Sequence, residues 1–287
     1  MPIRYRQTLC PTLPVCEEAG FRAPSTSDAL CSYGTPGLGN LRHLPELSHL
    51  TKAAQDQAAE LLWPTRCVAC EQPGELLCAQ CRAELPWIDQ RWACPCCGAP
   101  FGSLTCTECK GDWPSRSCVC ALPFKGAGAR LVTCLKDAHE LRLAPVVAAA
   151  IATALDEAAA WPAPDGCPRH DPEHLDAICF VPATWKAYRR RGFDHMELVA
   201  RELSWLLGLP LLDALVRGPA LDQRLLGRRD RARNLKGTVE VVQDVAGLDL
   251  LLVDDVVTTG ASMCACAEAL LAGGATTVSA CSLARVW

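Results

Sequence analysis

The stretch LLLVDDVVTTGAS, residues 250–262, limits the possible folds of this 287-residue chain more than any other segment. Its uninterrupted apolar run predicts a strand that is buried on both faces, as in a parallel sheet covered by helices. Two aspartates, Asp254 and Asp255, follow at the carboxyl end, the edge where open α/β sheets bind ligands. The alternative is a plain turn whose aspartates only begin the next helix, although a buried acid pair without partners is costly.

A loop of small residues follows the acids and precedes an expected helix from Ser262 to about residue 272. Its backbone N–H groups, its hydroxyls and the positive end of the helix dipole can together hold a phosphate dianion. A glycine in the loop lets the chain wrap closely around such a ligand. The acids could accept hydrogen bonds from sugar hydroxyls beside that phosphate. The candidate phosphate-binding residues are Thr258, Thr259, Gly260, Ala261 and Ser262.

Strand and helix patterns alternate through the second half of the chain. FDHMELVARELSWLLG predicts an amphipathic helix that ends at Gly208, and an alanine-rich helix is expected over about 140–160. This alternation predicts an α/β fold, with a parallel sheet and flanking helices. Apolar runs rich in β-branched residues predict three more strands, over 175–182, 237–242 and 276–286.

We expect three parts along the chain: a poorly structured tail over 1–60, a Cys-rich module over 61–115 and the α/β domain over 116–287. The first 50 residues hold six prolines and no sustained periodicity. They are therefore expected to be disordered, or to be an over-extended start upstream of a non-Met initiation codon. No segment approaches the ~20 apolar residues of a membrane-spanning helix, and the N-terminus does not resemble a signal peptide. We expect a cytoplasmic protein without a membrane segment.

Cysteine is unusually frequent, with 20 in the chain, and eight of them form four Cys-x-x-Cys pairs within 43 residues. This spacing is typical of zinc sites, whereas scattered cysteines in a small secreted chain suggest disulfides. Four thiolates leave no open position on Zn²⁺, so the metal would stabilise the fold and take no part in catalysis. The expected ligands are Cys67, Cys70, Cys78, Cys81, Cys94, Cys97, Cys106 and Cys109.

The grouping of these eight ligands is open from the sequence. Sequential grouping of the first two pairs and of the last two pairs closes the shortest loops, so we prefer it. Interleaved grouping, with the first pair joined to the third and the second to the fourth, is the alternative. The chain is expected to hold one or two Zn²⁺ ions.

The acid pair and its loop resemble the phosphoribosyl-pyrophosphate (PRPP) signature of type I phosphoribosyltransferases. The resemblance implies that Asp254 and Asp255 hold the ribose 2′- and 3′-hydroxyls, and that residues 258–262 hold the 5′-phosphate. It also implies Mg²⁺ between the pyrophosphate and the ribose oxygens. Members that salvage nucleobases carry an aspartate base at the first loop position. This chain has Thr258 there, so the resemblance assigns no general base.

Two more motifs, together with the cysteine pairs, narrow this resemblance: RRRGFDH at 189–195 and DQRLLGRRDRARNLKGTVEV at 222–241. In this order the features are similar to the ComF family, competence-associated proteins of bacteria, over about residues 60–287. In the first motif Arg-Gly-Phe matches the family pattern, whereas Asp194-His195 replaces its Asn-Gln. The family implies action on incoming single-stranded DNA during natural transformation, beside a helicase-like partner. The second motif matches at Gln223, Leu226, Arg231, Asn234 and Gly237.

Residues 186–236 are basic, with twelve Lys/Arg against six Asp/Glu, in a chain whose formal net charge is −4. The arginines could close over pyrophosphate, or follow a nucleic-acid backbone, or belong to a solvated helix face. For Arg189, Arg190 and Arg191 we favour pyrophosphate, because they lie just after the strand expected at 175–182. Two functions stay open: a phosphoribosyltransferase with an unidentified acceptor, and a non-catalytic PRPP sensor or DNA adaptor.

The acid pair also carries an expectation about stability. A buried carboxylate without a partner destabilises the ligand-free protein. From the sequence, Asp255→Asn should therefore weaken PRPP binding while leaving thermal stability unchanged or slightly higher.

Overall fold

The structure is a computed structural model that describes residues 60, 64–109, 113–162, 166–218 and 239–287. All of these belong to one unit, Lys52–Trp287. The expectations for the N-terminal tail, and the family matches between Gln223 and Gly237, lie outside the described residues.

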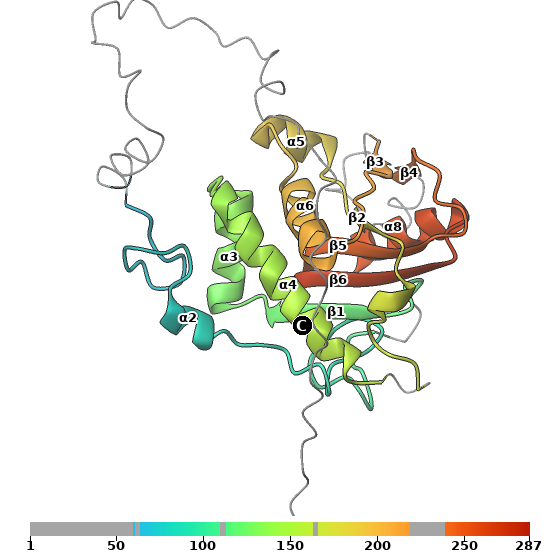
Figure 1. Cartoon of the computed structure of the whole chain (residues 1–287), viewed down its shortest axis with the longest axis horizontal. Helices are drawn as coiled ribbons and strands as arrows, with labels where there is room; N and C mark the ends of the chain where they lie inside the picture. Colours follow the sequence, from blue (N-terminus) through green and yellow to red (C-terminus); the bar gives the residue numbers. More distant parts are fainter. Residues whose placement is uncertain (1–59, 61–63, 110–112, 163–165, 219–238) are drawn as a thin grey trace, which may run out of the picture. The chain divides into compact units, whose positions relative to one another are not determined.

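A four-stranded parallel sheet forms the centre of this unit (Figure 1). Its strand order is β1-β6-β5-β2, which confirms the expected α/β fold with a parallel sheet. A separate antiparallel pair, β3 (Leu215–Arg217) and β4 (Val239–Val241), holds the strand expected at 237–242. The main strands are β1 (Cys118–Pro123), β2 (Ala177–Phe180), β5 (Asp249–Val257) and β6 (Thr277–Arg285).

Helices cover both faces of the sheet, which is why its central strand reads as a continuous apolar run. On β5, Leu251 and Val253 pack into the core under α3, α4 and α6. Leu250 and Leu252 face the opposite way and pack with α8. The covering helices are α3 (Gly126–Lys136), α4 (Ala144–Ala159), α6 (His195–Leu207) and α8 (Ala261–Ala272).

The turn between β2 and α6 contains a short helix, α5 (Trp185–Arg191), and its ends follow ordinary capping rules. Asp194 caps α6 by accepting from the Met196 N–H at 2.9 Å, and it also accepts from the Ala183 N–H at 2.6 Å. α6 ends at Gly208, whose φ of +67° favours glycine, as the sequence predicts. The Asp194 that departs from the family pattern therefore fixes the turn after β2.

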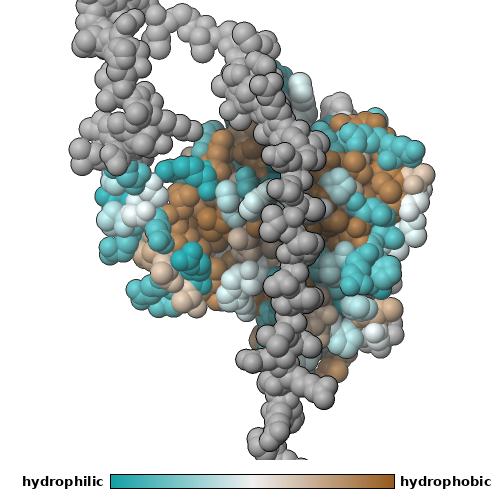
Figure 2. Space-filling view, in the orientation of Figure 1, coloured by the Kyte–Doolittle hydropathy of each residue, from teal (hydrophilic) through white to brown (hydrophobic). Residues whose placement is uncertain are grey.

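The Cys-rich segment consists mainly of turns around one short helix, α2 (Ala79–Ala83). Its first part packs on α3, where Arg130 donates to the carbonyls of Val68 and Ala69, each at 3.3 Å. Figure 2 shows hydrophobic patches on both sides of the grey trace, with hydrophilic residues among and around them. The described residues also contain two 3₁₀ turns, Leu141–Leu143 and Pro172–His174.

No helix in the described part of the chain is long and apolar enough to cross a membrane.

Candidate functional site

The acid pair lies near the carboxyl end of β5, beside the end of β2. Phe180, the last residue of β2, pairs with Val253, so Asp254 and Asp255 extend just past the neighbouring strand. Both acids are buried, at 9% and 7% exposure, although β5 continues beyond them to Val257. They line a pocket of about 340 Å³ that also contains Thr258 and Ser262 of the predicted phosphate loop.

Asp255 has two partners that the sequence did not predict. Lys136, the last residue of α3, donates to its Oδ2 at 2.7 Å, and His195 Nε2 lies 2.8 Å from the same oxygen. Arg191 lies 3.0 Å from His195 Nδ1. A carboxylate only accepts and a guanidinium only donates, so His195 carries its proton on Nε2 and accepts through Nδ1. His195 thereby links Arg191 to the acid pair.

The two acids lie in opposite electrostatic environments. Burial and the negative charge of Asp255 raise the pKa of Asp254 well above its usual range. Burial also acts to raise the pKa of Asp255, but the hydrogen bond from His195 and the charge of Lys136 outweigh it and lower that pKa. The pair therefore holds a proton more tightly on Asp254, and its negative charge lies mainly on Asp255.

The loop after β5, predicted to bind phosphate, leads into α8 through a glycine in the left-handed conformation. Thr258 and Thr259 are exposed, and Gly260 precedes α8 with a φ of +78°, in the left-handed region. The Thr259 hydroxyl accepts from the Ala261 N–H at 3.4 Å. The loop therefore leads directly into the N-terminus of a twelve-residue helix, where the dipole favours an anion.

Three predicted arginines take different positions. Arg191 lines the pocket, and its Nε is buried without a hydrogen-bond partner among the described residues. Arg190 pairs with Asp137 at 3.2 Å and lines an adjoining cavity of about 450 Å³, together with Lys136 and Arg191. The Arg189 guanidinium lies over the Trp185 ring, 5.9 Å from its centroid.

One further arginine, Arg217 of β3, lines the pocket without having been predicted. Its Nε and Nη2 are also buried and have no hydrogen-bond partner in the part of the chain that the structure describes. Unpaired buried donors are costly, so Arg217 and Arg191 both suit an anionic ligand. The sequence gives little reason to place Arg217 in the site, because a single basic residue in a short strand is more often solvated.

The eight predicted zinc ligands form two separate four-cysteine clusters. This is the sequential grouping that the shorter loops favour: the first cluster contains Cys67, Cys70, Cys78 and Cys81, and the second contains Cys94, Cys97, Cys106 and Cys109. Within the clusters, sulfur–sulfur distances of 3.6 and 3.7 Å occur. Zn–S bonds of about 2.3 Å in a tetrahedron place sulfurs about 3.8 Å apart, so both clusters fit structural Zn²⁺.

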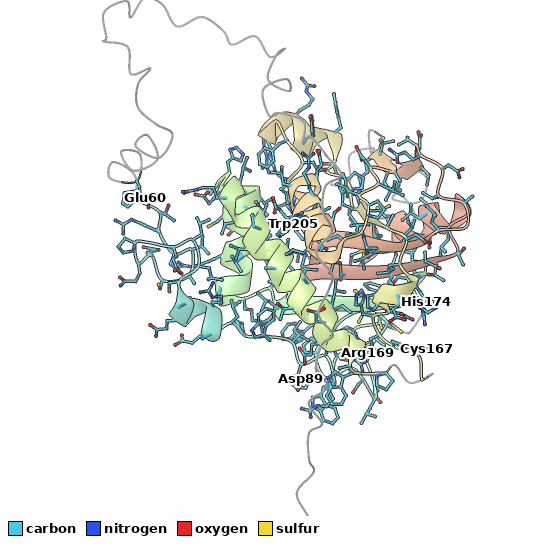
Figure 3. All side chains as sticks on the ribbon, in the orientation of Figure 1. Glu60, Asp89, Cys167, Arg169, His174 and Trp205 are labelled. Atoms are coloured by element: carbon cyan, nitrogen blue, oxygen red, sulfur yellow. The ribbon has the colours of Figure 1, made fainter. Side chains whose placement is uncertain are left out.

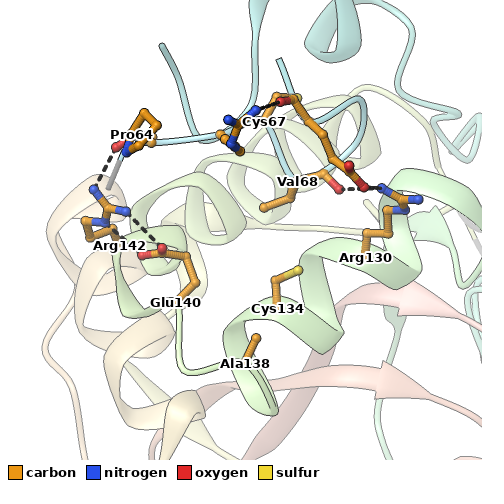
Figure 4. A pocket seen from close by; sticks show the side chains of 11 residues that line it. Pro64, Cys67, Val68, Arg130, Cys134, Ala138, Glu140 and Arg142 are labelled. Atoms are coloured by element: carbon orange, nitrogen blue, oxygen red, sulfur yellow. Dashed lines mark hydrogen bonds and ion pairs between the residues drawn. The ribbon is translucent and has the colours of Figure 1, made fainter. Parts of the chain in front are cut away.

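A larger cavity, of about 550 Å³, lies between the first cluster and α3 (Figure 4). Its charged side chains already have partners: Arg142 pairs with Glu140 at 2.8 Å, and Arg130 with Glu71 at 3.4 Å. It contains neither the acids nor the phosphate loop. Asp254, Asp255 and Thr258 line the smaller pocket instead.

The fold and the site define a class: a type I phosphoribosyltransferase-like α/β protein preceded by two cysteine clusters. The family described as "Double zinc ribbon domain" matches residues 58–110. DNA utilization protein YhgH of Salmonella typhi is 32% identical over 233 residues, covering 77% of this chain and 97% of that protein. The chain therefore belongs to the ComF family, to which YhgH belongs.

Two other relatives cover shorter stretches. YhgH of Escherichia coli K12 is 38% identical over 112 residues, which are 38% of this chain and 49% of that protein. Ribose-phosphate pyrophosphokinase of Agrobacterium fabrum is 42% identical over 77 residues, 25% of each chain.

Proposed function

We propose that the protein binds PRPP with Mg²⁺ in the pocket at the end of β5. The observation that carries this proposal is the buried acid pair, next to a glycine-containing loop at the start of α8. The ribose would lie against Asp254 and Asp255, and the 5′-phosphate against residues 258–262. The similarity to a ribose-phosphate pyrophosphokinase supports a ligand of this class.

The charges of the pocket support an anionic ligand. Asp254 favours its neutral form and Asp255 its charged form, so the negative charge of the pair lies mainly on Asp255. Lys136, Arg191 and Arg217 line the same pocket, and two of them keep buried N–H groups without partners among the described residues. This surplus positive charge is what a pyrophosphate group requires.

Magnesium would be held by ligand oxygens together with one carboxylate of the acid pair. Among the described residues the only groups that could form a complete protein cage are the two cysteine clusters, which do not suit Mg²⁺. Mg²⁺ commonly binds through one or two carboxylates plus substrate phosphates. When bound, it would neutralise charge that develops on departing pyrophosphate.

Two activities fit this site. In the first, the protein transfers the phosphoribosyl group, and its own residues orient the ribose and stabilise the pyrophosphate with Lys136 and the arginines. In the second, PRPP is only sensed, and the protein acts as an adaptor. The second is favoured by Thr258, which stands where nucleobase-salvage enzymes of the resembled class carry an aspartate base.

We propose single-stranded DNA as the macromolecular partner. α5 exposes Trp185 and Tyr188, at 58% and 45%, with the basic residues Arg189 and Arg190 on the same short helix. Exposed aromatic rings between cations suit stacked bases and a phosphate backbone. The cavity lined by Lys136 and Arg190 adjoins the PRPP pocket, so a strand on α5 would lie beside the ribose site.

The cellular setting follows from the family and is proposed with the same function. The protein would act in the cytoplasm on incoming DNA in natural transformation, beside a helicase-like partner. Its zinc module over 61–115 and its α/β domain over 116–287 would form separate parts of one functional unit. The name "DNA utilization protein" of its relatives supports a role with DNA.

Calorimetry tests this proposal directly. PRPP should bind the wild-type protein with Mg²⁺ and bind more weakly when the metal is chelated, whereas ribose 5-phosphate, which lacks the pyrophosphate, should bind weakly in both conditions. Absence of PRPP binding with Mg²⁺ would overturn the proposal. Release of pyrophosphate on adding single-stranded DNA or a small acceptor then separates the enzyme from the sensor.

A further inference from the structure

One buried arginine joins the second cysteine cluster to the phosphate loop. Arg285, the last residue of β6, is 2% exposed. Its Nε donates to the carbonyl of the zinc-ligand residue Cys97 at 2.9 Å. Its Nη1 donates to the carbonyls of Val257 at 3.2 Å and Thr258 at 2.7 Å, at the start of the loop, and also to that of Val286.

A second contact joins the same two regions. Trp113 packs against the small hydrophobic core of Cys94, Cys97 and Ala99 at the second cysteine cluster, and also against the core beneath β5 and α8. A Cβ atom added at Gly260 would overlap the Trp113 ring. The loop thus lies between the second cluster and its own ligand site, with no room for a larger residue.

The first cysteine cluster has no comparable link. It packs on α3 through Arg130, and no hydrogen bond joins it to residues 257–262 in the described part of the chain. The two clusters have similar sulfur geometry, so this difference lies in what they contact.

We propose that the second cluster positions the phosphate loop through Arg285, while the first cluster does not. A guanidinium fixes several carbonyls at once because its donors lie in one rigid plane. Held by Arg285, the Thr258 carbonyl cannot turn toward a bound anion, which it would repel. Arg285 is therefore a positioning residue, and loss of the second zinc should release the loop.

Another buried arginine provides a matched control. Arg169, labelled in Figure 3, is 6% exposed and donates to the carbonyls of Gln90, Arg91 and Ala93, just before the second cluster. It stabilises the same module with the same chemistry but makes no hydrogen bond to residues 257–262 in the described structure. Arg169→Met therefore separates general destabilisation from loss of the link.

The test measures hydrogen exchange of residues 256–264 without ligand, together with zinc content and PRPP affinity. Arg285→Met and Cys106→Ser should speed exchange in this segment, where the Cys264 N–H bonds to the Gly260 carbonyl. Both should weaken PRPP binding about tenfold, because a released loop must be ordered again when the ligand binds. Arg285→Lys, which can reach fewer carbonyls, should fall between Arg285→Met and the wild type.

Cys70→Ser, in the first cluster, and Arg169→Met should leave exchange in 256–264 at the wild-type rate. The proposed role of the second cluster is wrong if Arg285→Met and Cys106→Ser both keep the wild-type rate of hydrogen exchange in 256–264. It is also wrong if Cys70→Ser speeds this exchange as much as Cys106→Ser does. Should Arg285→Met fail to fold, the comparison of Cys106→Ser with Cys70→Ser decides alone. The inference rests on the proposed function only for the affinity measurement. If the wild type binds no PRPP, the proposed function fails, and hydrogen exchange of residues 256–264 still tests whether the second cluster positions the loop.

Discussion

Asp254 and Asp255 are adjacent in the sequence but lie in opposite electrostatic environments, so we expect their replacement to change the free energy of unfolding in opposite directions. Asp255 has Lys136 and His195 as partners, whereas Asp254 accepts the N–H of Asp255 at 2.9 Å and has a strongly raised pKa. The sequence-based expectation of a neutral or stabilising Asp255→Asn assumed an unpaired carboxylate. The observed partners of Asp255 contradict that assumption. A stabilising replacement is therefore expected at Asp254 instead.

Asp254→Asn should stabilise the ligand-free protein at neutral pH. A carboxyl with a raised folded pKa loses stability as pH rises from its unfolded pKa, about 4, toward the folded value. Asparagine keeps the acceptor oxygen and carries no charge at any pH, so the variant should show a gain in stability at pH 7. This gain should shrink as pH falls toward about 4. Thermal melts at several pH values measure this, and lower stability at pH 7 would contradict it.

Asp255→Asn should destabilise the protein by about 1–3 kcal/mol, because it removes the carboxylate that pairs with Lys136 and accepts the hydrogen bond from His195. Its folded pKa is lowered, so its stabilisation is present above about pH 4 and is lost as pH falls below that value. The cost should therefore be largest at neutral pH. PRPP affinity should also fall by about tenfold, measured by calorimetry at a temperature where both proteins are folded. Equal PRPP affinity of Asp255→Asn and the wild type would show that Asp255 does not contact the ligand.

At the scale of elements, α5 separates residues that are contiguous in the sequence. Gly192 ends the helix with a φ of +82°, and its three final arginines point to three environments: Trp185, Asp137 and His195. Only Arg191 lines the acid-pair pocket, because one helical turn spreads three consecutive residues around the axis. Arg189 and Arg190 are thereby available to another ligand.

We expect single-stranded DNA to bind α5 through its exposed side chains. Arg189→Ala combined with Arg190→Ala should lower both affinity and the salt dependence of binding, since fewer counterions are released. Trp185→Ala should weaken binding by about 1–3 kcal/mol with the salt slope unchanged, because stacking involves no ions. Fluorescence anisotropy across a salt series measures both, with Trp205→Ala as the control, since that side chain is 80% exposed on α6. If both α5 variants bound single-stranded DNA as the wild type does, the DNA would bind to a surface other than α5.

Across the whole molecule, the two cysteine clusters are not equivalent modules. Cys67, Leu77 and Leu85 are buried in the same hydrophobic core as α3 and α4. The segment around the first cysteine cluster, the first ribbon, is therefore part of the core of the α/β domain. Cys94 and Cys97 form a small core of their own beside the end of β6.

The purified protein should contain two Zn²⁺ per chain when kept reduced. Cys67→Ser should lose one zinc and loosen the packing of the first ribbon on α3, while the sheet domain stays folded. Metal analysis and circular dichroism check this. Protein without zinc after purification under reducing conditions, or a complete loss of the fold in Cys67→Ser, would be the opposite result.

The sequence by itself determined the features that depend on neighbours along the chain. The acids, the loop and α8 are consecutive, so one apolar strand followed by small residues was enough to predict their order. The cysteine clusters are also local, since short loops favour sequential grouping. β1 was missed because CVCALP resembles a continuation of the cysteine pairs and has little β-branching.

Only the tertiary structure decided which distant side chains complete the site. Lys136 lies 119 residues from Asp255, and Arg285 lies 188 residues from Cys97. A single lysine at a helix end or arginine at a strand end gives no pattern that distinguishes it from a solvated residue. Their positions follow from the strand order β1-β6-β5-β2 and from α3 crossing one face of the sheet. Those arrangements depend on burying apolar surface between elements far apart in the chain, which no local spacing encodes.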